Sequence, residues 1–204
     1  MRKDFVFLAL VVLILIAGCN NQAGQLPGLS EDTKNKTLTD IYKYNSVHEF
    51  KYKLTSYSET KTTNAELKIA VSSDNLDNIP SWLTETEVVL EEESSKTEAW
   101  IDKNTLKCLK IMIETSYAGK IFEQEMPCPD EGIEGTSRTG NEAEYITTES
   151  ITVPLGTFTA NKYVVVSGGG KTYLWASSNI PIPLKVEQWS NEKLVSLMEL
   201  ESYS

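Results

Sequence analysis

The chain has 204 residues, of which 40% are hydrophobic and 24% are charged, a composition typical of one globular domain that excludes a multi-pass membrane protein. The net charge of −10 argues against a nucleic-acid partner, because binding a phosphate backbone needs clustered Lys and Arg. A single histidine, His48, and three cysteines leave little material for imidazole catalysis or for a zinc site with several protein ligands.

Residues 1–18 are predicted to be a secretory signal peptide. Arg2 and Lys3 form a short positive start, and residues 5–16 form an unbroken apolar run. A membrane span needs about 20 apolar residues, so this segment is too short to cross a bilayer. An uncleaved anchor helix is the alternative interpretation.

The end of this segment, Leu15-Ile16-Ala17-Gly18-Cys19, resembles the lipobox of prokaryotic lipoproteins. The resemblance implies that cleavage occurs before Cys19, and that its thiol carries a thioether-linked diacylglycerol. Two acyl chains hold a protein stably at a bilayer, whereas one gives only marginal binding. The expected location is therefore the extracytoplasmic side of a cell membrane or cell envelope, with the membrane contacted through the lipid.

Residues 19–37 are predicted to be the lipidated N-terminus and a flexible tether, because they are polar, contain Gly and Pro, and lack a hydrophobic period. The triplet Asn35-Lys36-Thr37 matches the Asn-x-Thr acceptor sequence, which makes Asn35 a candidate glycosylation site. The folded domain is expected over residues 38–204.

The dominant period of this domain is two, which predicts a mainly β fold. In the clearest run, Ala65, Leu67, Ile69 and Val71 alternate with polar residues. A second run, around Phe50, behaves in the same way. Further strands are expected over residues 84–93, 95–101, 107–114, 120–126, 142–152, 157–167, 171–177, 183–190 and 193–201.

Most connections are predicted to be tight turns, at residues 102–104, 117–119, 168–170 and 190–192, so neighbouring strands should be antiparallel. Residues 127–141 form one longer loop. One or two short helices are expected, over residues 39–44 with Thr39 as the N-cap and over residues 74–82. A sheet of about ten strands must curl because strand twist accumulates, which allows a strongly curved half-barrel, a closed barrel or a two-sheet sandwich.

Once Cys19 is acylated, Cys108 and Cys128 remain as an even pair in an exported chain, and we expect them to form a disulfide. Two buried free thiols are the alternative. A metal site or a redox-active pair is disfavoured because the spacing lacks a Cys-x-x-Cys motif.

The C-terminal half carries a second resemblance. Residues 151–163 contain Val153-Pro154-Leu155-Gly156-Thr157-Phe158 and are followed by an aromatic strand at residues 173–177 and by Ile180-Pro181-Ile182-Pro183-Leu184-Lys185. Together with residues 97–106, this pattern is similar to the outer-membrane-lipoprotein-sorting superfamily. The resemblance implies a curved antiparallel half-barrel whose concave apolar side binds acyl chains in the sorting proteins.

Four aromatic residues are the candidates for lining an apolar ligand groove, since such pockets are built from these side chains. They are Phe50, Trp100, Phe158 and Trp175. Ordinary core packing is the competing interpretation for each of them. The acidic run at residues 91–93 is interpreted as a solvated face, because neighbouring strand residues point to opposite sides.

The sequence thus predicts a lipid-anchored protein that binds or carries a lipid or another apolar ligand in a curved sheet. The alternative is a cell-surface interaction or sensor protein with a filled sheet interior and a protein partner. No Gly-x-Ser-x-Gly, phosphate loop or His-Glu-x-x-His motif is present, so we expect neither an enzyme nor a bound cofactor or metal.

Overall fold

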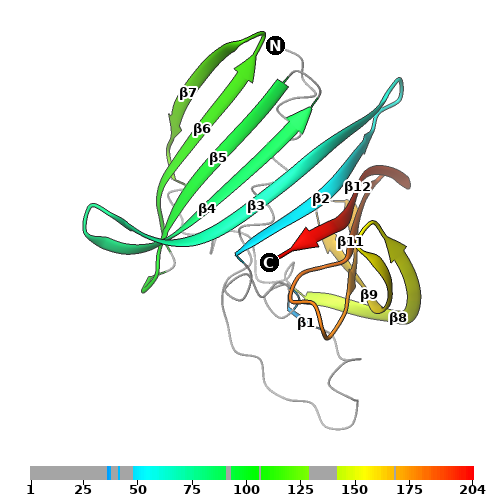
Figure 1. The fold of residues 1–204 in the computed structure, drawn as a ribbon. Helices are drawn as coiled ribbons and strands as arrows, with labels where there is room; N and C mark the ends of the chain where they lie inside the picture. Colours follow the sequence, from blue (N-terminus) through cyan, green and yellow to red (C-terminus); the bar gives the residue numbers. More distant parts are fainter. Residues whose placement is uncertain are drawn as a thin grey trace.

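The structure, a computed structural model, describes residues 36–37, 41, 48–90, 93–105, 107–128, 142–167 and 169–204. Over these residues the chain forms one antiparallel sheet of twelve strands, counting a first strand of two residues (Figure 1). The prediction of a mainly β antiparallel fold is confirmed. The signal peptide, Cys19, most of the tether and Asn35 lie outside the described residues.

The strands alternate apolar and polar side chains, as a sheet with unlike faces requires. Their bounds are β1 (Lys36–Thr37), β2 (Glu49–Tyr57), β3 (Thr62–Leu76), β4 (Ile79–Leu90), β5 (Glu93–Asp102), β6 (Cys108–Tyr117), β7 (Lys120–Met126), β8 (Glu142–Val153), β9 (Gly156–Ser167), β10 (Gly170–Ala176), β11 (Lys185–Ser190) and β12 (Lys193–Tyr203).

The helical turn predicted over residues 74–82 is wrong. These residues form the end of β3, a two-residue turn and the start of β4, with Leu76 paired to Ile79. Asp77 and Asn78 have φ angles of 52° and 66°. Asp and Asn adopt this left-handed conformation more readily than most residues, and such turns match the twist of the flanking strands. The helix predicted over residues 39–44 lies outside the described residues except for Ile41, which is helical and buried.

The tight turns predicted after β5, β6 and β11 are confirmed. The β6–β7 turn uses Ala118 at φ 50° and Gly119 at φ 72°, and the β11–β12 turn uses Asn191 and Glu192 at φ 49° and 61°. Of the loop predicted at residues 127–141, only Pro127 and Cys128 are described.

The strand order is β1-β8-β9-β10-β11-β12-β2-β3-β4-β5-β6-β7, so strands from the two ends of the chain meet at β12 and β2. The two ends of this order, β1 and β7, are not paired to each other over the described residues, which makes the sheet open and rules out the closed barrel. Lys36 and Thr37, expected in the tether, instead pair with Ala143 and Glu142 of β8.

Figure 1 shows β2 to β7 as a broad spread of strands, with β8 to β12 gathered beside them. The β8–β9 turn reaches β12 although three strands separate β8 from β12 in the sheet order: the backbone N–H of Leu155 donates to the carbonyl of Leu200 at 3.0 Å. Strands β8 to β12 therefore do not lie flat.

The hydrophobic core is concentrated where β8 to β12 lie beside β2 and β3. The segment between β10 and β11 fills it with Ile180, Ile182 and Leu184, which are 6%, 0% and 0% exposed. The hydroxyl of Tyr52 donates to the carbonyl of Pro183 at 2.7 Å and ties this segment to β2. The interior next to β12 is thus occupied by the chain's own side chains.

Candidate functional site

The register divides strands β2 to β6 into two unlike faces, because residues paired directly across an antiparallel ladder share a face. Leu67 pairs with Val88, and Ile69 pairs with both Phe50 and Thr86. Continuing the pairing brings Thr97, Ala99 and Ile111 to the same side. We call this side the apolar face, defined by Phe50, Leu67, Ile69, Thr86, Val88, Thr97, Ala99, Ile111 and Ile113.

The opposite side, which we call the charged face, carries a set of ion pairs. Lys96 on β5 lies 2.7 Å from Glu85 on β4 and 2.8 Å from Glu98, and the pKa of Lys96 is raised because it donates hydrogen bonds to both carboxylates. Lys68 pairs with Glu49 at 3.1 Å, and this contact raises the pKa of Lys68. These partly exposed pairs mark a face turned to water.

Several side chains of the apolar face are buried even in the outer strands. Val88, Ala99 and Ile111 are 6%, 5% and 7% exposed. Thr86 lies among them at 2%, and its hydroxyl has no hydrogen-bond partner among the residues that the structure describes. An unpaired hydroxyl in an apolar setting is costly, so a partner for it would stabilise the protein.

The four residues predicted to line one groove do not come together. Phe50, at 1% exposure, lies on the apolar face. Trp100 lies on the charged face, where it pairs with Lys110. Trp175 lies on this face too, because Lys53 of the charged face pairs with Glu199, Glu199 pairs with Lys185, and Lys185 pairs with Trp175. Phe158 packs half-buried against the core. The register therefore does not bring all four side chains to one face, and Phe50 and Trp175 belong to the hydrophobic core, against which Phe158 packs.

Trp175 instead belongs to an aromatic–lysine cluster that the sequence analysis missed. Lys162 on β9 and Lys185 on β11 flank its strand, and their Nζ atoms lie 4.6 and 4.7 Å from the Trp175 ring centroid. Its indole Nε1 donates to Glu149 Oε1 at 2.5 Å. Trp175 is 3% exposed and belongs to the hydrophobic core, and cation–π attraction to the two lysines stabilises its position. The signal in the sequence that could have revealed this cluster is one aromatic residue, Trp175, on a strand whose two neighbours each carry a lysine, Lys162 and Lys185.

Trp100 is held in a similar way on β5. Its Nε1 donates to Oδ2 of Asp74, and the Lys110 Nζ lies 5.8 Å from its ring centroid. The hydrogen bond from Trp100 lowers the pKa of Asp74, with a further contribution from the backbone N–H of Asn75. Trp100 is half-buried, whereas Trp175 is 3% exposed.

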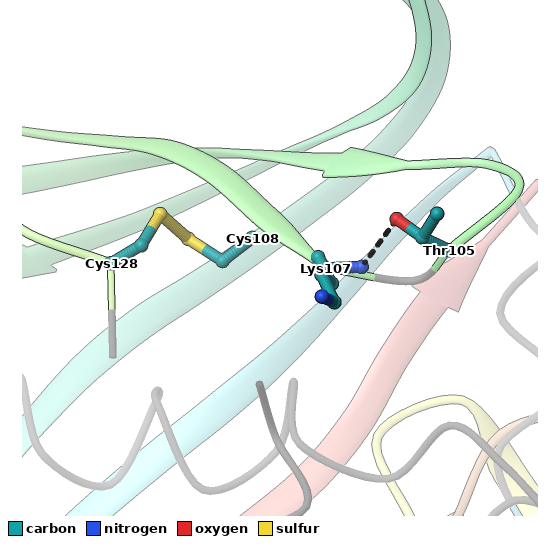
Figure 2. Close-up of a disulfide and its surroundings, with 4 residues drawn as sticks. All are labelled: Thr105, Lys107, Cys108 and Cys128. Atoms are coloured by element: carbon teal, nitrogen blue, oxygen red, sulfur yellow. Dashed lines mark hydrogen bonds between the residues drawn. A yellow bond between two sulfur atoms is a disulfide. The ribbon is translucent and has the colours of Figure 1, made fainter. Parts of the chain in front are cut away.

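The outermost strands end at a disulfide. Cys108, at the start of β6, is bonded to Cys128, just after β7, with Cα atoms 5.7 Å apart (Figure 2). In the adjoining turn the backbone N–H of Lys107 donates to Thr105 Oγ1 at 3.4 Å (Figure 2). The pair that the cysteine count predicted therefore lies at bonding distance.

Other candidates carry no site geometry. His48 is exposed at the start of β2, and Glu91 and Glu92 lie outside the described residues. Among the residues that the structure describes, no group of three or more His, Cys, Asp or Glu is placed to hold a metal. The same part of the chain contains no helix long and apolar enough to cross a membrane.

Comparisons with known proteins assign no family to this chain. No protein-family model matches this chain, and no curated protein matches it. Among solved structures, it is similar to a "putative lipoprotein" from Parabacteroides distasonis, with a TM-score of 0.36 and 17% sequence identity. The match covers 77% of this chain and 95% of the other.

Proposed function

We propose that this chain is a lipid-anchored extracytoplasmic protein that holds an acyl chain or another apolar ligand against the apolar face of β3 to β6. It acts as a binding protein and not as an enzyme. In this proposal the apolar face is the concave side of a curved, half-barrel sheet. Its contact with the membrane is through diacylglycerol on Cys19.

The observation that carries the ligand proposal is the difference between the two faces. Ion pairs cover the charged face, whereas the apolar face extends beyond the filled core at β12 to Ala99 and Ile111, near the open end of the sheet. A bound apolar ligand would remove from water the side chains of this face that are not yet buried, such as the half-buried Ile113. The unpartnered hydroxyl of Thr86 is a donor for a ligand carboxylate or ester.

The proposed anchor rests on residues 15–19, which resemble a lipobox, and on the short apolar run before them. The resemblance of residues 151–187 to the outer-membrane-lipoprotein-sorting superfamily supports a lipid as the ligand.

A protein-interaction role is the second candidate, favoured by the segment at residues 177–184. Its buried Ile182, Pro183 and Leu184 fill the interior beside β12, where a ligand would otherwise enter. If the chain's own side chains also fill the space against the apolar face of β4 to β6, no room remains for a ligand. The sheet is then a rigid support for a surface that recognises another protein.

The ligand proposal is tested with two neighbouring substitutions on β6. Ile113 lies on the apolar face between Thr97 and Gln124, whereas Met112 lies on the charged face between Glu98 and Glu125, and both are half-buried. We expect Ile113→Arg to weaken binding of a fluorescent fatty acid at least tenfold and Met112→Arg to leave it within twofold. Absence of saturable fatty-acid or phospholipid binding to the unmodified protein would refute the proposal.

The anchor is tested separately by mass analysis of the protein purified from membranes. We expect an N-terminal peptide that begins at Cys19 and carries the added mass of diacylglycerol. The Cys19→Ser variant should leave the membrane fraction and keep its fold by circular dichroism. An unmodified Cys19 thiol, or an intact signal segment, contradicts the anchor and leaves the ligand test unaffected.

A further inference from the structure

Strand β7 is an open edge of the sheet. Over the described residues it pairs with β6 alone, in a regular register from Tyr117–Lys120 to Ile111–Met126. All seven of its side chains are exposed. At the opposite end of the sheet, β8 is paired with β1, so the two ends differ in whether a further strand covers them.

The β6–β7 turn determines which backbone groups are open. Ala118 and Gly119 have φ angles of 50° and 72°, as in a two-residue turn that closes with a hydrogen-bonded pair. Hydrogen-bonded and non-hydrogen-bonded pairs then alternate, starting from Lys120. The N–H and C=O groups of Ile121, Glu123 and Glu125 therefore point away from β6, and another strand can bond to them.

The side chains of β7 indicate what kind of strand would fit. On the apolar face, Phe122 and Met126 are 59% and 36% exposed. On the charged face, Glu123 lies directly opposite Glu114, and neither forms an ion pair within the described residues. Like charges opposite each other destabilise a sheet. A cation on a further strand would offset this repulsion.

We propose that the β7 edge binds an extended segment of a partner protein in which Lys or Arg alternates with apolar residues. Main-chain hydrogen bonds add this segment to the sheet, its cations face Glu123, and its apolar side chains contact Phe122 and Met126. A second copy of this chain is a poorer occupant: antiparallel pairing along the full length of β7 sets the two Glu123 side chains opposite one another. The proposal is independent of ligand binding at the apolar face.

The test uses the full purified protein and fluorescein-labelled nine-residue peptides in which Lys alternates with Val. We expect saturable binding that weakens as salt increases, and at least tenfold weaker binding of a Glu–Val peptide and of a block Lys–Val peptide of the same composition. N-methylation of alternate amides on the side facing β7 should abolish binding, whereas methylation on the other side should not. Equal binding of the alternating and block peptides overturns the proposal.

Two substitutions at Glu123 on β7 distinguish the contribution of the backbone hydrogen bond to peptide binding from that of the carboxylate charge. Glu123→Pro removes an outward N–H without taking a ladder bond from β6, and should weaken peptide binding more than tenfold. Glu123→Gln keeps the N–H and should weaken it several-fold. Glu144→Gln, an exposed glutamate on β8, is the matched control and should have no effect. Unchanged affinity in both Glu123 variants, or concentration-dependent dimerisation that Glu123→Pro abolishes, would refute the proposal.

Discussion

The indole of Trp100 on β5 donates a hydrogen bond to the carboxylate of Asp74 on β3, with Nε1 and Oδ2 2.7 Å apart across the intervening strand β4. The contact joins three strands in a part of the sheet where the charged face is otherwise held by ion pairs. It also lowers the pKa of Asp74 below its ordinary value of 3.8.

A carboxyl group with a lowered pKa in the folded state stabilises the protein above its ordinary pKa, and this contribution is lost as pH falls through the folded-state pKa. We therefore expect Asp74→Asn to be less stable than the unmodified protein at pH 7, and the difference to shrink as pH falls below about 4 and to disappear only once Asp74 is protonated in the folded state. Thermal unfolding between pH 2.5 and 7 measures this. If Trp100 is the cause, the effect should be much smaller in a Trp100→Phe background.

Glu149 is expected to be important for stability because it accepts from the Nε1 of Trp175, a side chain with 3% exposure. Glu149→Ala would leave a buried N–H without its partner, which costs about 1–3 kcal/mol. Urea denaturation measures the loss. The same substitution in a Trp175→Phe background should cost clearly less, and equal costs in both backgrounds would contradict this role of Glu149.

The Cys108–Cys128 disulfide closes a sequence separation of 20 residues. Closing a loop of this size stabilises the folded state by about 3 kcal/mol through the entropy of the unfolded chain. We expect reduction to lower the free energy of unfolding by about that amount and to speed hydrogen exchange at β7. The double variant Cys108→Ser/Cys128→Ser should be equally weakened and should not respond to reductant.

Thr86 offers a change in the opposite direction. Its buried hydroxyl has no partner in the described part of the chain, so Thr86→Val should raise the free energy of unfolding by about 1 kcal/mol. Thr97→Val, at the half-buried position paired with Thr86, should have a smaller effect. If Thr86 donates to a ligand, Thr86→Val should also weaken fatty-acid binding while it stabilises the protein.

The alternation in residues 65–71 was enough to predict a strand, since a period of two has no other common explanation. The same argument failed at residues 74–82, where Asp77 and Asn78 form a tight turn inside a strand pair. Propensity alone suggested a helical turn there, because the two residues that mark the turn are also common near helix ends.

By itself, the sequence determined the β class and the antiparallel order of neighbouring strands, because these depend on local periodicity and short turns, and the cysteine count favoured the pairing of Cys108 with Cys128, which the structure shows. Only the tertiary structure decided which face each tryptophan occupies. Trp100 stands between Ala99 and Ile101, and Trp175 follows Leu174, so alternation is ambiguous at both. The face then depends on register across several strands, and a shift of one residue reverses it, as near the irregularities at Trp100/Ile101 and Tyr145/Thr147.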